Sequence, residues 1–449
     1  MRAIINSHWF FILILIPISV FYFWGTKLVP FHPDESTQIF MSEDFNRYLS
    51  DPLEMIWEPG THLSSTGRYR MLDAPLTRYL IGLGRMLASI PAQSVDWDWS
   101  KSWYENQQNG AFPNDNYLIV GRLSVAIIFP LGIILLYRLG SMLGSKIGGL
   151  AAVLFFGTNA LVLLHTRRAM AESVLVFSII ASLYALLRAD KRPLLAGLIV
   201  ALAFNAKQSA LALLPIGLLA VCWMPTRKPN KAQRIGVNLS QYLGGFILLS
   251  ILLNPFLWRH PIQATQEAIY QRRILMRNQV SDVSNLAPSQ VLDEPSERMA
   301  ILLAQLFIIP PSFSEVGNYQ TQTTPAELEY IEITGHQLGR EPLTGGIILG
   351  ITLIGIGVTI SEVNVAERKR RRRMLLFLLA FLTMAFGQIV MVPLPWQRYS
   401  MPLIPFISLY FGIGFAWAIK NSRRFIPHGR LSNQLSKVLS QFSPDSWMS

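Results

Sequence analysis

The stretch WFFILILIPISVFYFWGTKLVPFHPDES, residues 9–36, decides the fold class. It opens with an apolar run of about twenty residues, which is long enough for a helix to cross a bilayer. No small-residue cleavage site follows the run, so we expect a retained first span and not a signal peptide. Two carboxylates, Asp34 and Glu35, come directly after it. We therefore expect both at the point where the first span leaves the membrane.

The composition of the whole chain supports a polytopic membrane protein. Of its 449 residues, 51% are hydrophobic and only 15% are charged. The net charge of +12 would suggest nucleic acid in a soluble protein, but here the basic residues cluster between apolar runs, so no nucleic-acid partner is expected. Cys222 is the only cysteine, so no intrachain disulfide can form.

Apolar runs of sufficient length predict an all-α fold with about ten transmembrane helices. The run 194–224 is interpreted as a hairpin of two short spans with its tip at 205–209. The apolar part of 299–313 is short for a span and is interpreted as an interfacial or re-entrant segment. The ten predicted spans are 9–29, 117–138, 148–164, 172–188, 193–206, 208–224, 240–257, 344–361, 374–392 and 401–419.

The distribution of Lys and Arg sets the orientation, because cytoplasmic connections of membrane proteins carry an excess of both. With the N-terminus inside, every inside connection is net basic, including RADKRP, TRKPNKAQR and ERKRRRR. The long connections 31–116 and 258–343 carry more Asp and Glu than Lys and Arg, and so are predicted outside. This divides the chain into a catalytic membrane module over 1–257, an outer loop with an interfacial helix over 258–343, C-terminal spans over 344–420 and a cytoplasmic basic tail over 421–449.

The first outer loop is predicted to carry amphipathic helices that lie on the membrane surface. TQIFMSEDFNRYL and GRYRMLDAPLTRYLIGLGRML both have apolar residues at roughly helical spacing. Its aromatic stretch VDWDWSKSWYE suits the head-group level of a membrane, and a sugar-stacking platform is the alternative interpretation. The second outer loop, 258–343, is the expected cover of an acceptor site.

Several charged or polar side chains adjoin the predicted spans on the outer side, where Lys and Arg are normally scarce. Guanidinium groups there can bind a phosphate through paired hydrogen bonds, and a charge so close to hydrocarbon is costly unless it has a partner. Snorkelling to the phosphates of bulk lipid is the alternative for each cation. The set comprises Arg167, Arg168, Glu172, Lys207, Arg398 and Tyr399.

Asp34 and Glu35 also allow two interpretations. Acidic residues after Pro33 favour a helix N-terminus and can cap it. A carboxylate at the membrane surface beside a set of cations is equally suited to act as a general base. The position in the chain leaves both roles open.

The order of these motifs resembles the GT-C superfamily of membrane glycosyltransferases, particularly the branch of protein O-mannosyltransferases and lipid A aminoarabinose transferases. HPDES is similar to the Asp-Glu motif of that branch, and LDAPLTRYLIGLGRML to its Pro-containing amphipathic element, although Asp73-Ala74-Pro75 departs from the usual residues. The segment ending in HTRRAMAE resembles a signature in which an Arg precedes an acid by five residues, here Arg167 and Glu172. WQRYSMPLIPF is similar to the Arg-Tyr-x-x-Pro-x-x-Pro element. The resemblance covers the layout of residues 1 to about 420.

The resemblance implies a glycosyltransferase that moves a sugar from a polyprenyl-phosphate donor to an acceptor glycan, lipid or protein hydroxyl, with inversion. It implies Asp34 as the base with Glu35 beside it, donor-phosphate binding by Arg167, Lys207 and Arg398, and orienting roles for Glu172, Arg168 and Tyr399. No metal or other cofactor is expected. The expected location is the plasma (inner) membrane with an extracytoplasmic active site.

Two other classes of protein remain open on the sequence. A transporter or flippase of lipid-linked sugars would also place cations on the outer face, but no internal repeat typical of transporters is found. A purely structural membrane subunit would not need a cluster of costly charges on one face.

Overall fold

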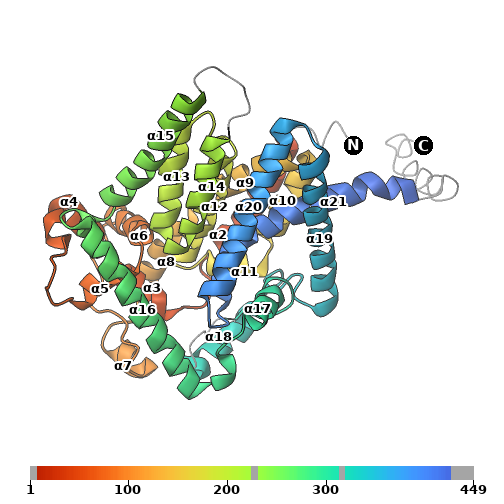
Figure 1. Cartoon of the computed structure of the whole chain (residues 1–449). Coiled ribbons are helices and arrows are strands. Elements are labelled where there is room, and N and C mark those ends of the chain that lie inside the picture. The colour runs from red at the N-terminus through yellow and green to blue at the C-terminus, as the bar shows by residue number, and fades with distance from the viewer. Residues whose placement is uncertain (1–7, 224–230, 313–318, 426–449) are drawn as a thin grey trace.

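The structure is a computed structural model, and it describes residues 8–223, 231–312 and 319–425. Within these ranges every regular element is helical (Figure 1). Most of the predicted tail 421–449 lies outside the described residues. The α-helices are α2 (His8–Trp24), α3 (Pro33–Met41), α4 (Glu43–Ser50), α5 (Ser65–Leu72), α6 (Leu76–Leu87), α7 (Trp103–Gln108), α8 (Asp115–Ala126), α9 (Phe129–Leu143), α10 (Lys146–Gly157), α11 (Ala160–His165), α12 (Ala171–Leu186), α13 (Pro193–Ala206), α14 (Leu214–Cys222), α15 (Lys231–Leu252), α16 (Pro261–Leu286), α17 (Pro295–Phe307), α18 (Gln320–Glu332), α19 (Pro342–Val365), α20 (Arg368–Met391) and α21 (Ile404–Phe425), with short 3₁₀ turns between some of them, among them η2 (Gln208–Leu213) and η6 (Gln397–Leu403).

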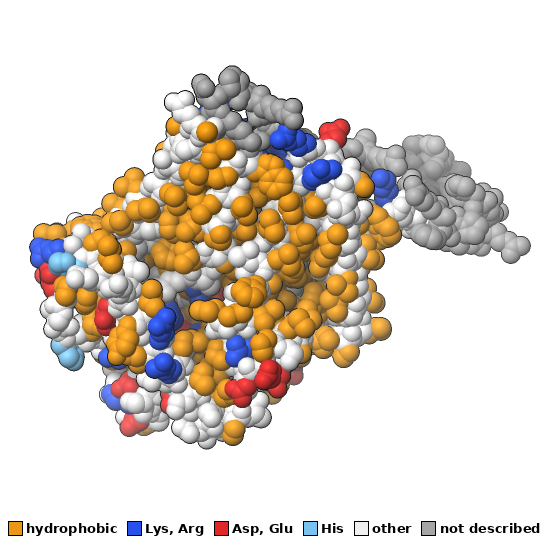
Figure 2. Space-filling view, in the orientation of Figure 1, with side chains coloured by type: hydrophobic (Ala, Val, Ile, Leu, Met, Phe, Trp, Pro, Cys, Tyr) orange, Lys and Arg blue, Asp and Glu red, His pale blue; other side chains and the backbone are white. Residues whose placement is uncertain are grey.

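Apolar helices form the middle of the molecule. Five are long and apolar enough to cross a membrane: Asp115–Leu143, Ala232–Leu252, Pro342–Val365, Arg368–Met391 and Gln397–Ser422. The other five predicted spans coincide with shorter apolar helices, so ten crossings stay a prediction. Figure 2 shows hydrophobic side chains covering the middle of the visible face, with charged side chains towards its two ends.

Several of the connections predicted to be cytoplasmic lie together at one end of these helices. We call this end the basic face. Arg372 at the start of α20 donates to the Asp190 carboxylate, 2.9 Å away, and to the Ala220 carbonyl, 2.6 Å away. Arg370 donates to Glu362 at 2.6 Å. The turn before α13, the end of α14 and the basic start of α20 therefore lie together.

The opposite end, which we call the loop face, carries the two long connections. Asn254 at the end of α15 donates to Asn205 at the end of α13 (Nδ2···Oδ1 2.6 Å). Lys207, which follows α13, pairs with Glu172 at the start of α12. Since Ala220 of α14 is back at the basic face, the chain reverses next to Lys207. This is the hairpin arrangement expected for 194–224.

Small residues allow α19 and α21 to approach closely. A Cβ atom on Gly355 would lie 1.9 Å from the carbonyl oxygen of Tyr410, whereas one on Gly357 would meet nothing within 4 Å. Backbone contact of this kind is typical of helix pairs packed through glycine in membranes.

We predict that Gly355→Ala lowers the free energy of unfolding by about 1–3 kcal/mol, because an added methyl group must push the two helices apart. Gly357→Ala, in the same helix, is the matched control and should leave stability unchanged or slightly higher. Thermal unfolding of the purified protein in detergent measures both. Equal melting temperatures for the two variants would contradict the close packing.

Helices α3 to α7 and α16 to α18 cover the loop face (Figure 1). Polar residues that accept from the following backbone N–H groups start several elements, as Ser64 does for α5 and Asn114 for α8. Helix α17 matches the expected short interfacial segment only in being helical and short. Its Gln305 and Arg298 donate to carbonyl oxygens at and just after the end of α20, so it packs against the loop-face end of that helix, and an interfacial or re-entrant position stays a prediction.

Part of the aromatic stretch of the first outer loop differs from both of its predicted roles. Trp97 is buried, and its indole N–H lies 3.3 Å from the hydroxyl of Tyr319 in the second outer loop. Trp103 packs on the same two rings, at 5.2 and 5.7 Å between centroids. Trp97 and Trp103 therefore belong to a core that joins the two long connections, whereas Tyr104 is exposed, and for the rest of the stretch both predicted roles stay predictions.

Candidate active site

Asp34 lies in the first turn of α3, where the chain leaves the first apolar helix. His32 is the N-cap of α3, and its Nδ1 accepts from the Asp34 backbone N–H at 3.1 Å. The cap therefore does not use the Asp34 carboxylate, whose side chain is 30% exposed and ion-paired with Arg398. Burial and the charges of Arg168 and Arg398 hold the pKa of His32 well below its usual range, so the imidazole is neutral.

Glu35 faces the opposite way and is completely buried. Arg122 of α8 donates to both of its oxygens at 2.8 Å. The same carboxylate accepts from the backbone N–H of His32 at 3.1 Å, completing the capping box, and from that of Ala169 at 2.9 Å. Burial alone would raise the pKa of Glu35, but the Arg122 guanidinium outweighs it and the pKa is lowered. Glu35 thus has no oxygen facing solvent, and its geometry is that of a structural residue.

Lys207, Arg398, Glu172 and Tyr399 form one array with Asp34. The Arg398 guanidinium carbon lies 5.8 Å from the centroid of the Tyr399 ring, and the Lys207 ammonium nitrogen lies 5.5 Å from the same centroid. Arg398 pairs with Asp34, and Lys207 pairs with Glu172. The two cations, partly exposed at 12% and 29%, therefore flank one aromatic ring, each beside a carboxylate.

Arg167 does not belong to this array, although the sequence predicts it as a phosphate ligand. It is completely buried and donates to the carbonyl oxygens of Tyr22 and Phe21 at 2.9 and 2.7 Å. Its Nη1 also contacts Tyr330 and His336 at 3.2 and 2.8 Å. A cation is well placed there because the last carbonyls of a helix have no partner within it. Arg167 therefore fastens the end of α2 to the second outer loop and is not available to a phosphate.

Arg168 is also buried, and its Nε donates to the Pro30 carbonyl at 3.1 Å. Its positive charge contributes to lowering the pKa of His32 and the pKa of Glu35. Arg168 therefore supports the chain between α2 and α3, and its predicted orienting role stays a prediction.

Two further carboxylates surround Asp34 that the sequence did not single out as site residues. Burial raises the pKa of Asp73, and the charge of Asp34 adds to the effect. Burial likewise raises the pKa of Asp96, whose carboxylate lies beside the Tyr69 hydroxyl and accepts from the Trp97 backbone N–H at 2.8 Å. Asp73 follows α5 and Asp96 lies in a connection, so no periodic pattern could have brought them to Asp34.

His165 is the last residue of α11 and lies two residues before Arg167. In the sequence, only its position in HTRRAMAE indicated that it could lie near the site. It is 1% exposed, and both ring nitrogens are buried without a hydrogen-bond partner among the residues that the structure describes. The positive charge of Arg168 favours the neutral form of this imidazole, whereas the Glu172 carboxylate favours its charged form. A buried imidazole of this kind can hydrogen-bond to a water molecule or to a bound substrate.

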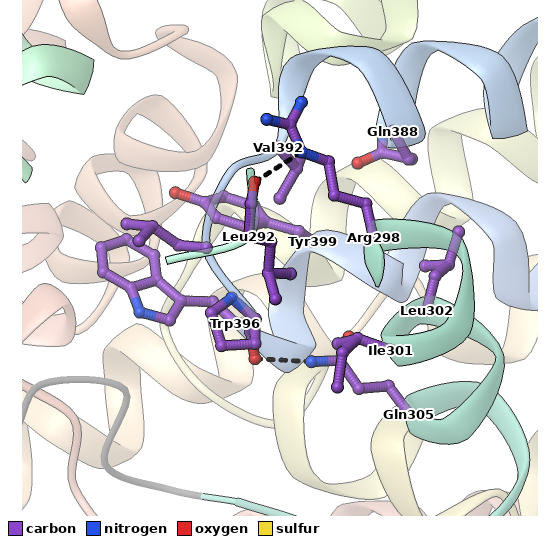
Figure 3. A pocket seen from close by; sticks show the side chains of 11 residues that line it. Leu292, Arg298, Ile301, Leu302, Gln305, Gln388, Val392, Trp396 and Tyr399 are labelled. Carbon is purple, nitrogen blue, oxygen red and sulfur yellow. Dashed lines mark hydrogen bonds between the residues drawn. The ribbon is translucent and has the colours of Figure 1, made fainter. Parts of the chain in front are cut away.

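An apolar pocket adjoins the array on the side of α17 and α20 (Figure 3). It is a shallow depression with a cavity volume of about 20 Å³. Arg298 and Gln305 close it by donating to the carbonyl oxygens of Leu292 and Pro395, as the dashed lines show. Trp396 and Tyr399 line it, and the Arg398 guanidinium carbon lies 4.9 and 5.8 Å from the centroids of their rings. The pocket therefore reaches from the helices to the ring that the two cations flank.

No group of three or more His, Cys, Asp or Glu side chains in the described ranges could hold a metal ion. The carboxylates near Asp34 instead have Arg398, Tyr69 or backbone N–H groups as neighbours. Independence from metal stays a prediction.

No protein-family model matches the sequence, and no curated protein matches it. The oligosaccharyltransferase of Archaeoglobus fulgidus in the apo form aligns with a TM-score of 0.49 and 14% identity over 95% of this chain and 52% of that chain. The archaeal oligosaccharyltransferase AglB from the same organism, in complex with an inhibitory peptide and a dolichol-phosphate, aligns with a TM-score of 0.46 and 12% identity over 96% and 55%.

This chain thus spans about half the length of the oligosaccharyltransferases it aligns with. Because the TM-scores lie below 0.5, the likeness establishes neither a shared family nor a shared activity. The resemblance to the O-mannosyltransferase branch also stays a prediction.

Proposed function

We propose that the protein is a membrane glycosyltransferase that moves a sugar from a polyprenyl-phosphate donor to an acceptor hydroxyl. One observation carries the proposal: a partly exposed carboxylate, Asp34, is paired with Arg398 in an array of cations at the end of a bundle of apolar helices. A base and a phosphate site thereby lie side by side. Both are needed when a hydroxyl attacks a sugar and a phosphate leaves.

The donor phosphate is assigned to Arg398 and Lys207. In the free protein both cations are neutralised by carboxylates, Asp34 and Glu172. A phosphate between them would accept charge-assisted hydrogen bonds from both, and such bonds are stronger than those between neutral groups. Arg398 would turn from Asp34 to the phosphate, and the Asp34 carboxylate would become free to act.

The reaction then proceeds in one displacement. The acceptor oxygen forms a bond to the anomeric carbon, and the bond from that carbon to the phosphate oxygen breaks. The proton of the acceptor goes to Asp34, and the electron pair of the broken bond stays on the phosphate. Attack opposite to the leaving group inverts the anomeric carbon. Glu35 and Arg167 position the chain around Asp34 and touch no substrate.

The lipid part of the donor requires apolar surface next to the phosphate site. The pocket at Trp396 and Tyr399 offers such a surface beside Arg398 and is walled by residues of α17 and α20. The first isoprene units fit its chemistry, and the rest of the chain would lie along the apolar helices. A soluble nucleotide-sugar donor has no lipid chain that could pack against this surface.

A transporter of lipid-linked sugars is the second candidate, since it too would bind a lipid phosphate at these cations. Incubation of the purified protein with polyprenyl-phosphate sugars and an acceptor separates the two. A transferase releases the lipid phosphate and forms a new glycosidic bond, whereas a transporter leaves the donor intact. Absence of lipid-phosphate release with every donor and acceptor pair tried, together with movement of intact donor in vesicles, would replace the first proposal by the second.

We predict that Arg398→Gln lowers kcat/KM by about 10²–10³-fold, because one preorganised donor to the leaving phosphate is lost. Arg259→Gln, which removes an exposed guanidinium paired with Glu58 at the same face, should stay within about threefold of wild type because exposed ion pairs contribute little. Steady-state kinetics with a polyprenyl-phosphate sugar measures both. Equal losses in the two variants would indicate a general effect of surface charge.

We place the protein in the inner membrane with the loop face outside, supported by the basic connections gathered at the other face. A reporter fused after residue 373 is expected to report cytoplasm, and one inserted near Ser289 to report the outside. The reverse result would place Asp34 and Arg398 in the cytoplasm and exclude an extracytoplasmic donor.

A further inference from the structure

A second pocket lies at the loop-face end of α10 and α19, apart from the Asp34 array. It has a cavity volume of about 100 Å³ and lies between the end of α10, the end of α17, the segment before α19 and α19 itself. Arg340 contributes the one charged side chain among its lining residues. The residues that matter below are Phe155, Asn159, Phe307, Leu338, Arg340 and Ile348.

The positive charge of Arg340 is buried without a carboxylate. The side chain is only 5% exposed. It donates through Nη1 to the Gln305 carbonyl at 2.6 Å and through Nη2 to the Asn159 side-chain oxygen at 3.2 Å, both neutral groups. Over the described ranges, Arg340 forms no ion pair with an Asp or Glu. Burial lowers the pKa of Arg340 to about 10.

These contacts hold the guanidinium in place but leave it capable of binding a ligand. A guanidinium has five N–H donors, and two protein acceptors account for only part of them. Asn159 is itself fixed, because its side-chain oxygen also accepts from the backbone N–H groups of Leu161 and Val162. A buried charge without a counter-ion is costly, so an anion is the ligand that this site favours.

The walls of the pocket decide which kind of anion fits. Phe155, Phe307 and Ile348 are apolar, and the first and last belong to helices of the apolar bundle. Leu338, which also lines the pocket, is 57% exposed, so apolar surface continues from the pocket to the outside of the molecule. A soluble anion would gain nothing from these surfaces, whereas an anion that carries acyl chains would cover them.

We propose that the Arg340 pocket binds a membrane phospholipid through its phosphate. The phosphate accepts hydrogen bonds from Arg340, and the acyl chains lie against Phe155 and Ile348 between α10 and α19. Gln305 connects this site with the segment before Arg398, since its carbonyl accepts from Arg340 while its side chain donates to Pro395. The bound lipid therefore supports α17 in its place beside the array. The proposal does not depend on the glycosyltransferase function.

Native mass spectrometry of the full-length, delipidated protein tests the site with three probes: phosphatidylglycerol, diacylglycerol with the same acyl chains, and inorganic phosphate. The variants are Arg340→Gln and Leu338→Glu. The second leaves Arg340 intact and adds a competing carboxylate at an exposed position two residues away, so it is expected to fold. Arg273→Gln, on the exposed side of α16, is the matched loss of a guanidinium.

We expect phosphatidylglycerol to bind wild type and Arg273→Gln equally, and Arg340→Gln and Leu338→Glu roughly tenfold or more weakly, as for the loss of a hydrogen-bonded charge pair. Should Arg340→Gln fail to fold, Leu338→Glu decides. Unchanged phosphatidylglycerol binding in the folded variants would overturn the proposal. So would equal binding of diacylglycerol, which would indicate an apolar site, or of inorganic phosphate, which would indicate a soluble ligand.

Discussion

Asp34→Asn is expected to lower kcat by about 10²–10⁴-fold, the usual contribution of a general base. The amide has nearly the shape of the carboxylate but cannot take the acceptor proton at neutral pH. The His32 cap of α3 should survive, because it uses the backbone N–H of residue 34 and not its side chain. The loss should therefore appear in the rate and not in the stability of the protein.

The same substitution has a second expected effect, on donor binding. In the free protein the Asp34 carboxylate competes with the donor phosphate for Arg398. Removing its charge leaves Arg398 to the phosphate, so the affinity for the donor should stay equal or increase. Donor binding to Asp34→Asn, measured under conditions without turnover, tests this, and a weaker affinity would contradict the exchange of partners at Arg398.

Asp282→Asn, on an exposed position of α16, is the matched control and should keep the activity of wild type. Turnover by Asp34→Asn at the wild-type rate would remove Asp34 from the chemistry. Asp73 and Asp96 would then be the next candidates, since both lie within the electrostatic influence of Asp34.

The sequence predicted at which end of the helix bundle a connection or a charged side chain lies. The length of apolar runs located the helices, and the distribution of Lys and Arg predicted which connections lie together, as the contacts of Arg372 with Asp190 and Ala220 show. The same reasoning placed Asp34, Lys207 and Arg398 at one end of the bundle. Their meeting around Tyr399 is a finding of the structure.

The sequence was uninformative about the partner of each charge. A cation expected near a phosphate can equally satisfy the carbonyl oxygens of a helix end, as Arg167 does with residues 145 and 146 positions away. Trp97 likewise meets Tyr319, which is 222 positions further along the chain. Local patterns predict the depth of a side chain, but such partners depend on how the outer loops pack over the helices.

Glu35 illustrates the limit most clearly, because its neighbour Asp34 has the same charge and nearly the same position. Glu35→Gln is expected to lower the free energy of unfolding by about 3–5 kcal/mol, since it leaves the buried Arg122 charge without its partner. The matched control is Glu105→Gln. Glu105 also completes a capping box, accepting from the Ser102 backbone N–H at 2.8 Å, but it is exposed and has no arginine partner within the described part of the chain. Its substitution should lower the free energy of unfolding far less than Glu35→Gln does, because it leaves no buried charge behind.

The pH dependence of stability gives a second test of Glu35. Its pKa is lowered in the folded protein, so the ion pair contributes stability above the ordinary pKa of 4.5, and the contribution is lost as the pH falls through the lower folded value. Wild type should therefore lose stability on acidification below about pH 4.5, and Glu35→Gln should lose less over the same range. Thermal unfolding of wild type and Glu35→Gln between pH 3 and 7, at intervals of about half a pH unit, measures the difference. A Glu35→Gln protein with the melting temperature of wild type but without transferase activity would show that Glu35 takes part in the chemistry, and that the buried pair with Arg122 is not its main role.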